Sequence, residues 1–295
     1  MQRTAVSGGL VVMWSSGFIG AELGTRHATT DTLLMWRFIV AAALVGGAWL
    51  LARRPRLSRR ALGGQVVIGL LSQGVYVGSI VGAIALGVPL GTTALIAALQ
   101  PLLAATLAGR ILGERATSRQ WVGLVAGLGG VALVVGDDLA TASSTPWPAY
   151  ALPFVGMAGL LAASLVERRL AEPVGLVDAL PVHCVTSAAA FAAAALLGGR
   201  ATPPQAFEFW LAVAWVVLLS TVAAYGLYWS SIRRYGVGHT SALMYLTPAA
   251  TTLWAFAMFG QPVSMAALSG MAICLAGVVA ATVANANQRT ASPVQ

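Results

Sequence analysis

Residues 91–101 read GTTALIAALQP and residues 238–248 read GHTSALMYLTP, so that Pro101 and Pro248 lie 147 positions apart. The same offset aligns 91–131 with 238–278 without a gap. Weaker matches, such as that between Asp31 and Asp178, extend toward the start of each half. The chain of 295 residues is therefore predicted to contain one structural unit twice.

The two copies differ systematically in the positions of their arginines. The five arginines between 53 and 60 align with a segment that holds Arg200 alone. Arg110, Arg115 and Arg119 align with Ala257, Pro262 and Ala266, whereas Leu86 and Gly87 align with Arg233 and Arg234. One unit thus carries its positive charge at opposite ends in its two copies. This arrangement is typical of a repeat inserted into a membrane in two opposite orientations.

The composition excludes a soluble protein. Hydrophobic residues make up 58% of the chain and charged residues 9%, against about 25% charged residues in soluble domains. The net charge of +8 does not indicate nucleic-acid binding, because the arginines form short clusters between long apolar runs. Cys184 and Cys274 lie in apolar runs, so we expect packing residues and neither a disulfide nor a metal site. The absence of Lys and the many Ala and Gly residues suggest a GC-rich bacterial genome.

Long apolar runs divide the chain into ten segments of the length that a membrane-spanning helix requires, about 20 residues. We predict spans at 5–24, 31–51, 62–85, 92–110, 119–136, 149–168, 178–198, 208–231, 239–258 and 266–285. Linkers rich in Gly and Pro are expected at 87–89, 145–148, 203–204 and 236–238. The first run lacks an A-x-A cleavage site, so we expect a retained helix and not a signal peptide. The predicted fold class is an all-α integral membrane protein.

The arginines also predict the orientation in the membrane. With the N-terminus in the cytoplasm, the outer loops hold only Arg26 and Arg200, Arg37 lies within a span, and the other arginines face the cytoplasm. Ten spans return the C-terminus to the cytoplasm, and five spans per repeat require the second repeat to enter from the opposite face. We therefore predict two inverted five-helix repeats, over 1–147 and 148–285, and a disordered cytoplasmic tail over 286–295.

An inverted repeat indicates transport, because two related halves can open a central site to either side of the membrane in turn. A channel would be expected to show a polar ring around a pore, and the spans contain none. An enzyme is not expected, because the chain lacks H-E-x-x-H and G-x-S-x-G motifs and its three histidines lie in different segments. Nothing in the sequence calls for a cofactor.

Several of these segments resemble the EamA family of the drug/metabolite transporter superfamily. The resemblance rests on Trp14, Arg37-Phe38, Gly91 to Ala94, Pro101, Gly113 to Arg115, Gln120 to Val131, Gly238 to Pro248 and Gly270 to Gly277. It covers essentially the whole chain and implies a carrier of metabolites, amino acids or drug-like solutes, with many exporters and no common substrate. Gln261 stands where the second repeat of the family usually has Glu, which is expected to weaken any contact of a carboxylate at this edge.

Polar and aromatic residues inside apolar spans are candidates for a central cavity. Gln73, Tyr76 and Ile80 share one helix face, as do Thr221, Tyr225 and Tyr228, and the Thr93, Ala97 and Gln100 face recurs as Thr240, Met244 and Thr247. The candidate substrate-binding residues are Trp14, Gln73, Tyr76, Gln100, Tyr225, Tyr228, Tyr245 and Thr247. The alternative is that these side chains pack between helices or lie at the membrane surface.

Pro101 and Pro248 fall in the middle of predicted spans. Each proline removes one backbone hydrogen bond and frees the carbonyl of Ala97 or Met244, which must then face protein or a water-filled cavity. The two prolines are therefore candidate hinges, with a fixed kink as the alternative.

Glu22 and Arg37 are charged residues placed within spans near the predicted outer face, and we consider them candidates for gating or ion coupling. Arg37 either reaches the outer headgroups or pairs with Glu22 or with helix carbonyls. His183 is expected to be a hydrogen-bonded packing residue. The small-residue rows Gly123, Gly127, Gly130 and Gly270, Cys274, Gly277 allow close helix contact, either within one molecule or between two copies.

The sequence therefore predicts a secondary transporter of the bacterial inner membrane that moves small organic metabolites, with export favoured over import. Its partners are a small-molecule solute and the lipid bilayer, and not nucleic acid; a monomer and a homodimer both remain open. The alternatives are a channel-like facilitator and a membrane sensor or assembly protein without transport activity.

Overall fold

The computed structural model describes residues 2–54, 57–100, 102–103, 118–141, 145–170 and 174–291. Within these residues every regular element is helical, which confirms the predicted all-α class. The α-helices are α1 (Gln2–Thr25), α2 (Thr30–Leu51), α3 (Arg59–Gly69), α4 (Tyr76–Ala85), α5 (Leu90–Ala98), α7 (Ser118–Thr141), α8 (Ala151–Arg169), α9 (Leu176–Leu197), α10 (Phe207–Trp215), α11 (Ala224–Met244), α12 (Thr247–Phe259) and α13 (Met265–Ala291). Two π-helical segments, η1 (Leu70–Val75) and η3 (Val216–Ala223), and the 3-10 turn η2 (Trp147–Tyr150) complete the set.

Eight helices in the described residues are long and apolar enough to cross a membrane, and they correspond to eight of the ten predicted spans. The predicted span 266–285 lies in α13, whose apolar part, Met265–Gly277, is shorter. The predicted span 92–110 runs beyond the described residues. Large apolar side chains such as Leu44, Val125 and Leu253 are exposed on the outside, as expected for a surface that faces lipid.

Two local predictions were wrong. The expected linker at 236–238 is helical, because α11 runs through it to Met244. In lipid an unbroken helix satisfies every backbone group, while a glycine inside it costs only about 1 kcal/mol. The predicted disordered tail is also partly wrong, since α13 continues to Ala291.

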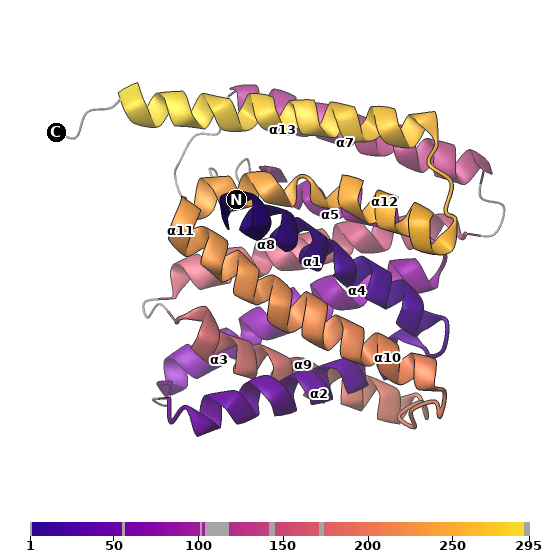
Figure 1. Cartoon of the computed structure of the whole chain (residues 1–295), viewed down its shortest axis with the longest axis vertical. Helices are drawn as coiled ribbons and strands as arrows, with labels where there is room; N and C mark the ends of the chain where they lie inside the picture. Colours follow the sequence, from indigo (N-terminus) through magenta and orange to yellow (C-terminus); the bar gives the residue numbers. More distant parts are fainter. Residues whose placement is uncertain are drawn as a thin grey trace.

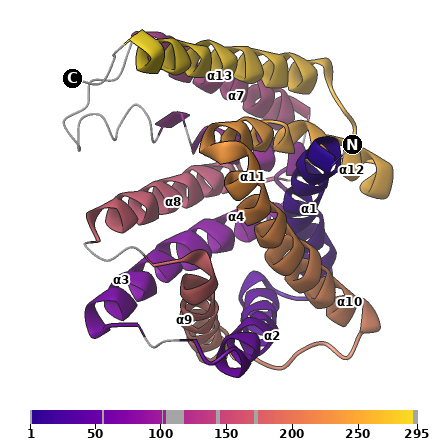
Figure 2. The ribbon, with the colours of Figure 1, turned by 60° about the vertical axis from the view of Figure 1, so that its left-hand side comes forward.

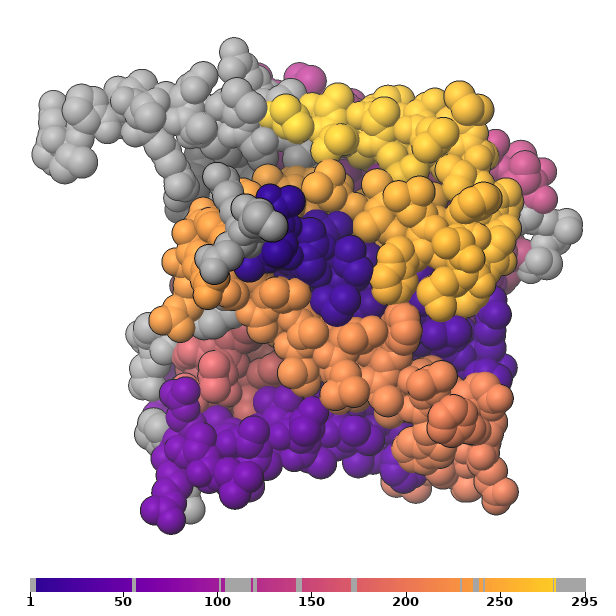
Figure 3. All heavy atoms as spheres, viewed as in Figure 1, coloured from indigo at the N-terminus to yellow at the C-terminus, as the bar shows by residue number. Residues whose placement is uncertain are grey.

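The helices form layers (Figures 1 and 2). The pair α7 and α13 covers one side of the molecule, and the pair α2 and α9 covers the opposite side. Between them, α1 packs against α10, η3, α11 and α12, while α8 packs against α3, η1 and α4. In the space-filling view α1 is a strip enclosed between α11 and α12 (Figure 3).

Helices α7 and α13 approach each other through the two predicted small-residue rows. A Cβ atom on Gly130 would lie 2.6 Å from the carbonyl oxygen of Gly270, and one on Gly277 would lie 2.8 Å from that of Gly123. The Cys274 thiol donates a hydrogen bond to the Gly127 carbonyl over 3.2 Å. The rows therefore form an internal contact and are not free to join two copies of the chain.

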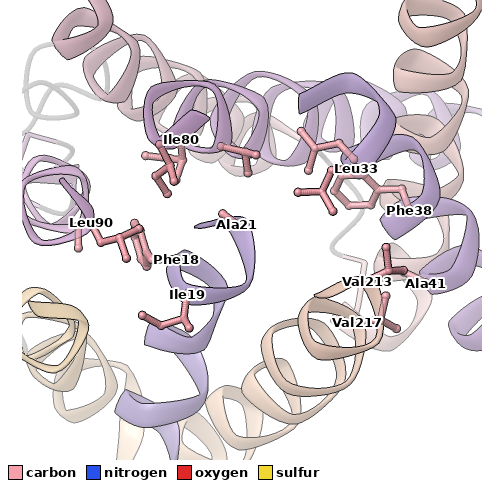
Figure 4. Packing of buried hydrophobic residues seen from close by; sticks show 14 of the residues in the cluster. Phe18, Ile19, Ala21, Leu33, Phe38, Ala41, Ile80, Leu90, Val213 and Val217 are labelled. Carbon is pink, nitrogen blue, oxygen red and sulfur yellow. The ribbon is translucent and has the colours of Figure 1, made fainter. Parts of the chain in front are cut away.

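The largest buried cluster lies where α1, α2, α4, α5, α9, α10, η3 and α12 meet. Phe18 and Ala21 of α1 lie near Ile80 of α4 and Leu90 of α5, and Phe38 of α2 lies beside Leu33 (Figure 4). Cys184 belongs to this cluster, and Cys274 belongs to a smaller one between α5, α7, α8 and α13. Both cysteines are buried, as expected of packing residues.

The connections after α1, α4, α7, α9 and α12 lie at one end of the helices, which we call the Glu22 end. The ends of α2 and α8 and the start of α3 lie at the opposite end, which we call the Arg59 end; there Leu170, just after α8, packs against Gly64 of α3. Helix α1 begins and α13 ends toward the Arg59 end, on the left in Figure 1.

Candidate functional site

A cavity lies between α1, α2, the α3–η1–α4 helix and the η3–α11 helix. It is lined by Trp14, Gly17, Phe18, Arg37, Gln73, Tyr76, Val77, Ile80, Val81, Ser220 and Tyr225. Its volume is about 70 Å³, well below the roughly 300–1,000 Å³ of typical ligand pockets. A metabolite therefore fits only if the walls move apart.

The two π-helical segments supply polar residues to this cavity. Gln73 lies in η1 and Ser220 lies in η3, and these two positions are equivalent at the offset of 147. A π-helical turn contains one residue more than an α-helical turn of similar rise and is frequent at functional sites. The Thr221 hydroxyl donates a hydrogen bond to the Val216 carbonyl over 3.1 Å within η3. Sequence spacing did not predict either π segment.

Four of the predicted cavity residues line the cavity, and a fifth, Tyr228, packs against one of them, Trp14. The Gln73 amide Nε2 donates a hydrogen bond to the Tyr225 hydroxyl over 2.7 Å, which links the two halves of the chain. The Trp14 ring lies 5.7 Å from the Tyr225 ring and 5.5 Å from the Tyr228 ring, measured between centroids. Tyr76 lines the same cavity. Helical spacing thus grouped residues that lie together in space although they are far apart in the sequence.

Arg37 lies in the cavity wall and does not reach the membrane surface. Its side chain is only 7% exposed, and its guanidinium carbon lies 5.2 Å from the centroid of the Phe38 ring. No described residue forms a salt bridge with it, and its Nε atom has no hydrogen-bond partner. The considered pairing with Glu22 is not formed. Glu22 instead pairs with Arg26 at 2.9 Å, since residues four positions apart are neighbours on a helix.

The remaining predicted residues lie elsewhere. Tyr245 and Pro248 line a second pocket of about 100 Å³ between α5, α12 and α13. The Thr247 carbonyl accepts a hydrogen bond from the Ser15 hydroxyl over 3.3 Å, while Gln100 lies just past α5 and does not line the cavity. The orientation of each helix about its axis decides these outcomes, and spacing along one helix does not reveal it.

Pro248 occupies the first turn of α12, after a break at Tyr245 and Leu246. The Leu246 amide bonds to the Leu243 carbonyl over 3.0 Å. The equivalent Leu99 amide bonds to the Ile96 carbonyl over 3.1 Å, where α5 ends. At equivalent positions two residues before Pro101 and Pro248, the chain therefore forms a tighter turn, with a hydrogen bond between residues three positions apart. Pro101 itself lies outside the described residues.

The Glu22 end is tied together by contacts between its loops. Arg200 pairs with Asp31 at 2.9 Å, and the Thr145 hydroxyl donates to the Gly87 carbonyl over 3.0 Å. The Leu90 amide donates to the Gln261 side-chain oxygen over 3.3 Å, and the Arg26 guanidinium lies 4.4 Å from the centroid of the Phe259 ring. Phe18, Ala21, Ile80 and Leu90 belong to one buried cluster (Figure 4), and along α1 Phe18 and Ala21 lie between the cavity residue Trp14 and this end.

Gln261 has a definite role in this network. Its oxygen accepts a bond from the first residue of α5, where helix amides lack an internal partner. The amide side chain therefore serves as an acceptor at the position where the resembling family usually has a carboxylate.

Sequence reasoning missed a second polar site. Asp138 accepts a hydrogen bond from the Thr92 hydroxyl over 2.6 Å and, with Asp137, lines a cavity of about 520 Å³ between α5, α7, α12 and α13. The fifth span was predicted to end at 136, whereas α7 continues to Thr141. In the described ranges, no three His, Cys, Asp or Glu side chains lie close enough to hold a metal ion.

His183 is buried, and its Nε2 atom lies 2.8 Å from the Gln65 side-chain oxygen. This contact joins α9 to α3. It agrees with the prediction of a hydrogen-bonded packing residue.

Comparison with known proteins assigns both halves to one family. The model of the EamA-like transporter family matches residues 8–136 and 150–283. The chain is 24% identical over 275 residues to the "Uncharacterized inner membrane transporter YedA" of Escherichia coli K12, covering 92% of this chain and 88% of that protein. The YedA proteins of Escherichia coli O6:H1 and O157:H7 match equally. A solved crystal structure, 22% identical, superposes with a TM-score of 0.66 over 95% of this chain and 96% of the other, which supports the fold.

Proposed function

The chain belongs to the EamA-like transporter family, and we propose that it exports small organic metabolites across the bacterial inner membrane by alternating access. The family and the YedA relatives identify a membrane transporter. The main structural support for alternating access is the cavity that both halves line. In its wall, Gln73 of η1 is hydrogen-bonded to Tyr225 of α11. A site between two related halves is where alternating access places the substrate.

The helix contacts support two inverted repeats. Helices α2 and α7 pack against their equivalents α9 and α13. Helix α1 packs against α10, η3 and α11 of the second half, and α8 packs against α3, η1 and α4 of the first half. A two-fold relation between the halves requires this exchange. The equivalent placement of η1 and η3, and of the breaks at Leu99 and Leu246, supports the same relation.

The distribution of charge supports an orientation with the Arg59 end in the cytoplasm. Arg59 and Arg60 open α3, and Arg168 and Arg169 end α8. Arg26 and Arg200, at the Glu22 end, are each paired with a carboxylate. A cysteine introduced at Ser58 should therefore resist an impermeant thiol reagent in intact cells, whereas one at Gln205 should react. The reverse pattern would refute this orientation.

The loop contacts support a conformation closed at the Glu22 end. Asp31 of α2 pairs with Arg200 after α9 at 2.9 Å. At the offset of 147, the residues equivalent to this pair are Asp178 of α9 and Arg53 after α2, at the Arg59 end. No salt bridge joins these two among the described residues, and Asp178 instead accepts a hydrogen bond from the Trp49 indole over 3.0 Å. In the proposed cycle the Asp31–Arg200 pair opens as an Asp178–Arg53 pair forms.

Solute counterflow in proteoliposomes tests the transport cycle. Vesicles loaded with a panel of metabolites should exchange an external labelled solute with saturable kinetics. A channel-like facilitator would give flux without saturation or counterflow, and a sensor or assembly protein would give no flux. Either result would refute the alternating-access proposal.

A matched pair of variants connects the flux to the cavity. Val77→Trp fills the cavity wall and should abolish counterflow. Val67→Trp makes the same change on the exposed side of α3 and should preserve it. Equal flux in the two variants would exclude this cavity as the transport site.

A further inference from the structure

Arg37 is a buried cation without a counter-ion in the described part of the chain. Arg37 is only 7% exposed and lines the cavity, and its Nε atom has no hydrogen-bond partner. Glu22 is bonded to Arg26 and Asp31 is bonded to Arg200, so neither of these carboxylates of α1 and α2 neutralises it.

An unpaired charge inside a membrane protein is expensive, and such residues usually pair or contact a ligand. The adjacent Phe38 ring, at 5.2 Å from the guanidinium carbon, offers a weak cation–π attraction. That attraction does not satisfy the five N–H donors of a guanidinium. Since no described residue supplies an acceptor for this guanidinium, a ligand that enters the cavity can supply one.

The cavity around Arg37 offers further hydrogen-bond donors and no negative charge. The Tyr225 hydroxyl accepts the Gln73 amide over 2.7 Å, so its own proton is available for another acceptor. The Ser220 hydroxyl also lines the cavity, and none of the lining residues is Asp or Glu. A cation would find no counter-charge here, whereas a carboxylate would meet a guanidinium with the planar geometry that favours two parallel hydrogen bonds.

Aromatic and aliphatic side chains form the other walls of the cavity. Trp14 and Tyr76 line the cavity beside Tyr225, and the Trp14 and Tyr225 rings lie 5.7 Å apart between centroids with 46° between their planes. Such walls favour a flat, apolar ligand body. The single positive charge balances one negative charge, so a dianion such as a phosphate monoester would leave an uncompensated buried charge.

We infer that the cavity binds a monoanionic organic acid with a flat apolar body, whose carboxylate pairs with Arg37. This inference rests on the transport proposed above and names the class of its substrate. The acid replaces the missing counter-ion of Arg37 when the walls separate. Arg37 is thus placed for binding and not for stability, and its presence should destabilise the empty protein.

Direct binding to the purified, detergent-solubilised full chain tests this inference without a need for flux. The probes are three acids, phenylacetate, indole-3-acetate and benzoate, together with phenylacetamide as the neutral analogue and phenethylamine as the cationic analogue. Isothermal titration at neutral pH should give binding of at least one acid and a preference of phenylacetate over its amide by roughly 10- to 100-fold, the range expected for a hydrogen bond to a charged group.

Two variants and one control separate ligand binding from a structural role. Arg37→Gln should remove the preference for the acid, and Arg37→Met should remove it while raising the thermal unfolding temperature of the empty protein, because a buried unpaired charge is lost. Arg60→Gln changes an exposed arginine of α3 outside the cavity and should leave both quantities unchanged. A structural arginine would instead lower the unfolding temperature when replaced.

The inference is overturned if none of the three acids binds the folded native protein, if the amine binds more tightly than the acid, or if Arg37→Gln retains the preference. Counterflow of a neutral or cationic solute without acid binding would overturn the inference and leave the transport proposal intact. Acid binding that depends on Arg37, without flux of any solute, would support the site and refute the transport cycle.

Discussion

Helices α7 and α13 are joined by two equivalent glycine contacts. Helices α2 and α9, in contrast, form only one of two equivalent salt bridges at their ends in the described residues. A Cβ atom added to Gly130 would lie 2.6 Å from the Gly270 carbonyl oxygen, and one added to the equivalent Gly277 would lie 2.8 Å from the Gly123 carbonyl oxygen. Asp31 pairs with Arg200 at 2.9 Å, but the equivalent Asp178 bonds to Trp49 and not to Arg53. Contacts that both halves make equally suit a fixed pair of helices, and a contact made at one end alone suits a part that changes between two conformations.

The largest expected effect comes from fixing the Asp31–Arg200 contact. In the double variant Asp31→Cys and Arg200→Cys, a flexible thiol cross-linker should join α2 to the loop after α9 and abolish counterflow until the link is cleaved. Either single variant treated with the same reagent serves as the control, since Cys184 and Cys274 are buried. Full counterflow in the cross-linked protein would show that this end does not open.

The next largest effect, on the unfolding temperature, should come from adding one methyl group to the α7–α13 contact. Gly130→Ala places a Cβ atom 2.6 Å from the Gly270 carbonyl, an overpacking that costs about 1–3 kcal/mol. Gly129→Ala is the matched control on the same helix, because its new Cβ atom would have no described atom within 4 Å apart from its chain neighbours and its own helix backbone. Thermal unfolding in detergent measures both variants. Equal unfolding temperatures would mean that the helices are not held together as described.

Removing one charge at either end should shift the equilibrium between the two conformations, and the two variants should shift it in opposite directions. Arg200→Gln removes the existing pair and should favour opening of the Glu22 end, whereas Arg53→Gln removes only a pair that belongs to the other conformation. Arg200 is 54% exposed, so the effect is limited to about 1 kcal/mol, roughly fivefold in population. The reaction rate of a cysteine at Ser220 with an external impermeant reagent reports it. Shifts of the same sign would contradict the exchange of pairs.

The smallest effect concerns Gln261 at the start of α5. Gln261→Glu keeps an acceptor for the Leu90 amide and adds a charge that the helix N-terminus favours by about 0.3–1 kcal/mol. Glu22 and Gln261 line one pocket at the Glu22 end, so the negative charge of Glu22 opposes this gain. The unfolding temperature should therefore change little, while Gln261→Ala, which loses the acceptor, should lower it. A lower value for Gln261→Glu than for Gln261→Ala would exclude the capping role.

Much of the fold could be predicted from the sequence because the determining interactions are local. A helix in lipid must satisfy its own backbone hydrogen bonds, so each apolar run of sufficient length predicts a helix. The break before Pro248 follows from the missing amide of proline, although it was expected inside a span and not at the start of α12. The π segments η1 and η3 left no recognisable pattern, because one extra residue in a turn alters neither composition nor hydropathy.

The candidate site could be predicted only in part. Spacing along single helices placed Gln73 and Tyr76, and Tyr225 and Tyr228, on common faces, and these residues do meet around Trp14. Tyr245 shows the limit of this approach, since it faces a different pocket. The direction in which a face points depends on how its helix is rotated against its neighbours, and spacing does not contain that information.

The sequence by itself determined the helical membrane fold, the duplication and the family, since each depends on composition or on matches along the chain. Only the tertiary structure decided the partners of the charged residues. Arg37 lies in the cavity without a carboxylate beside it among the described residues, while Glu22 pairs with Arg26 and Asp31 with Arg200. An ion pair requires its charged atoms to lie within about 4 Å of each other. Distances between segments far apart in the sequence are fixed only once the helices have packed.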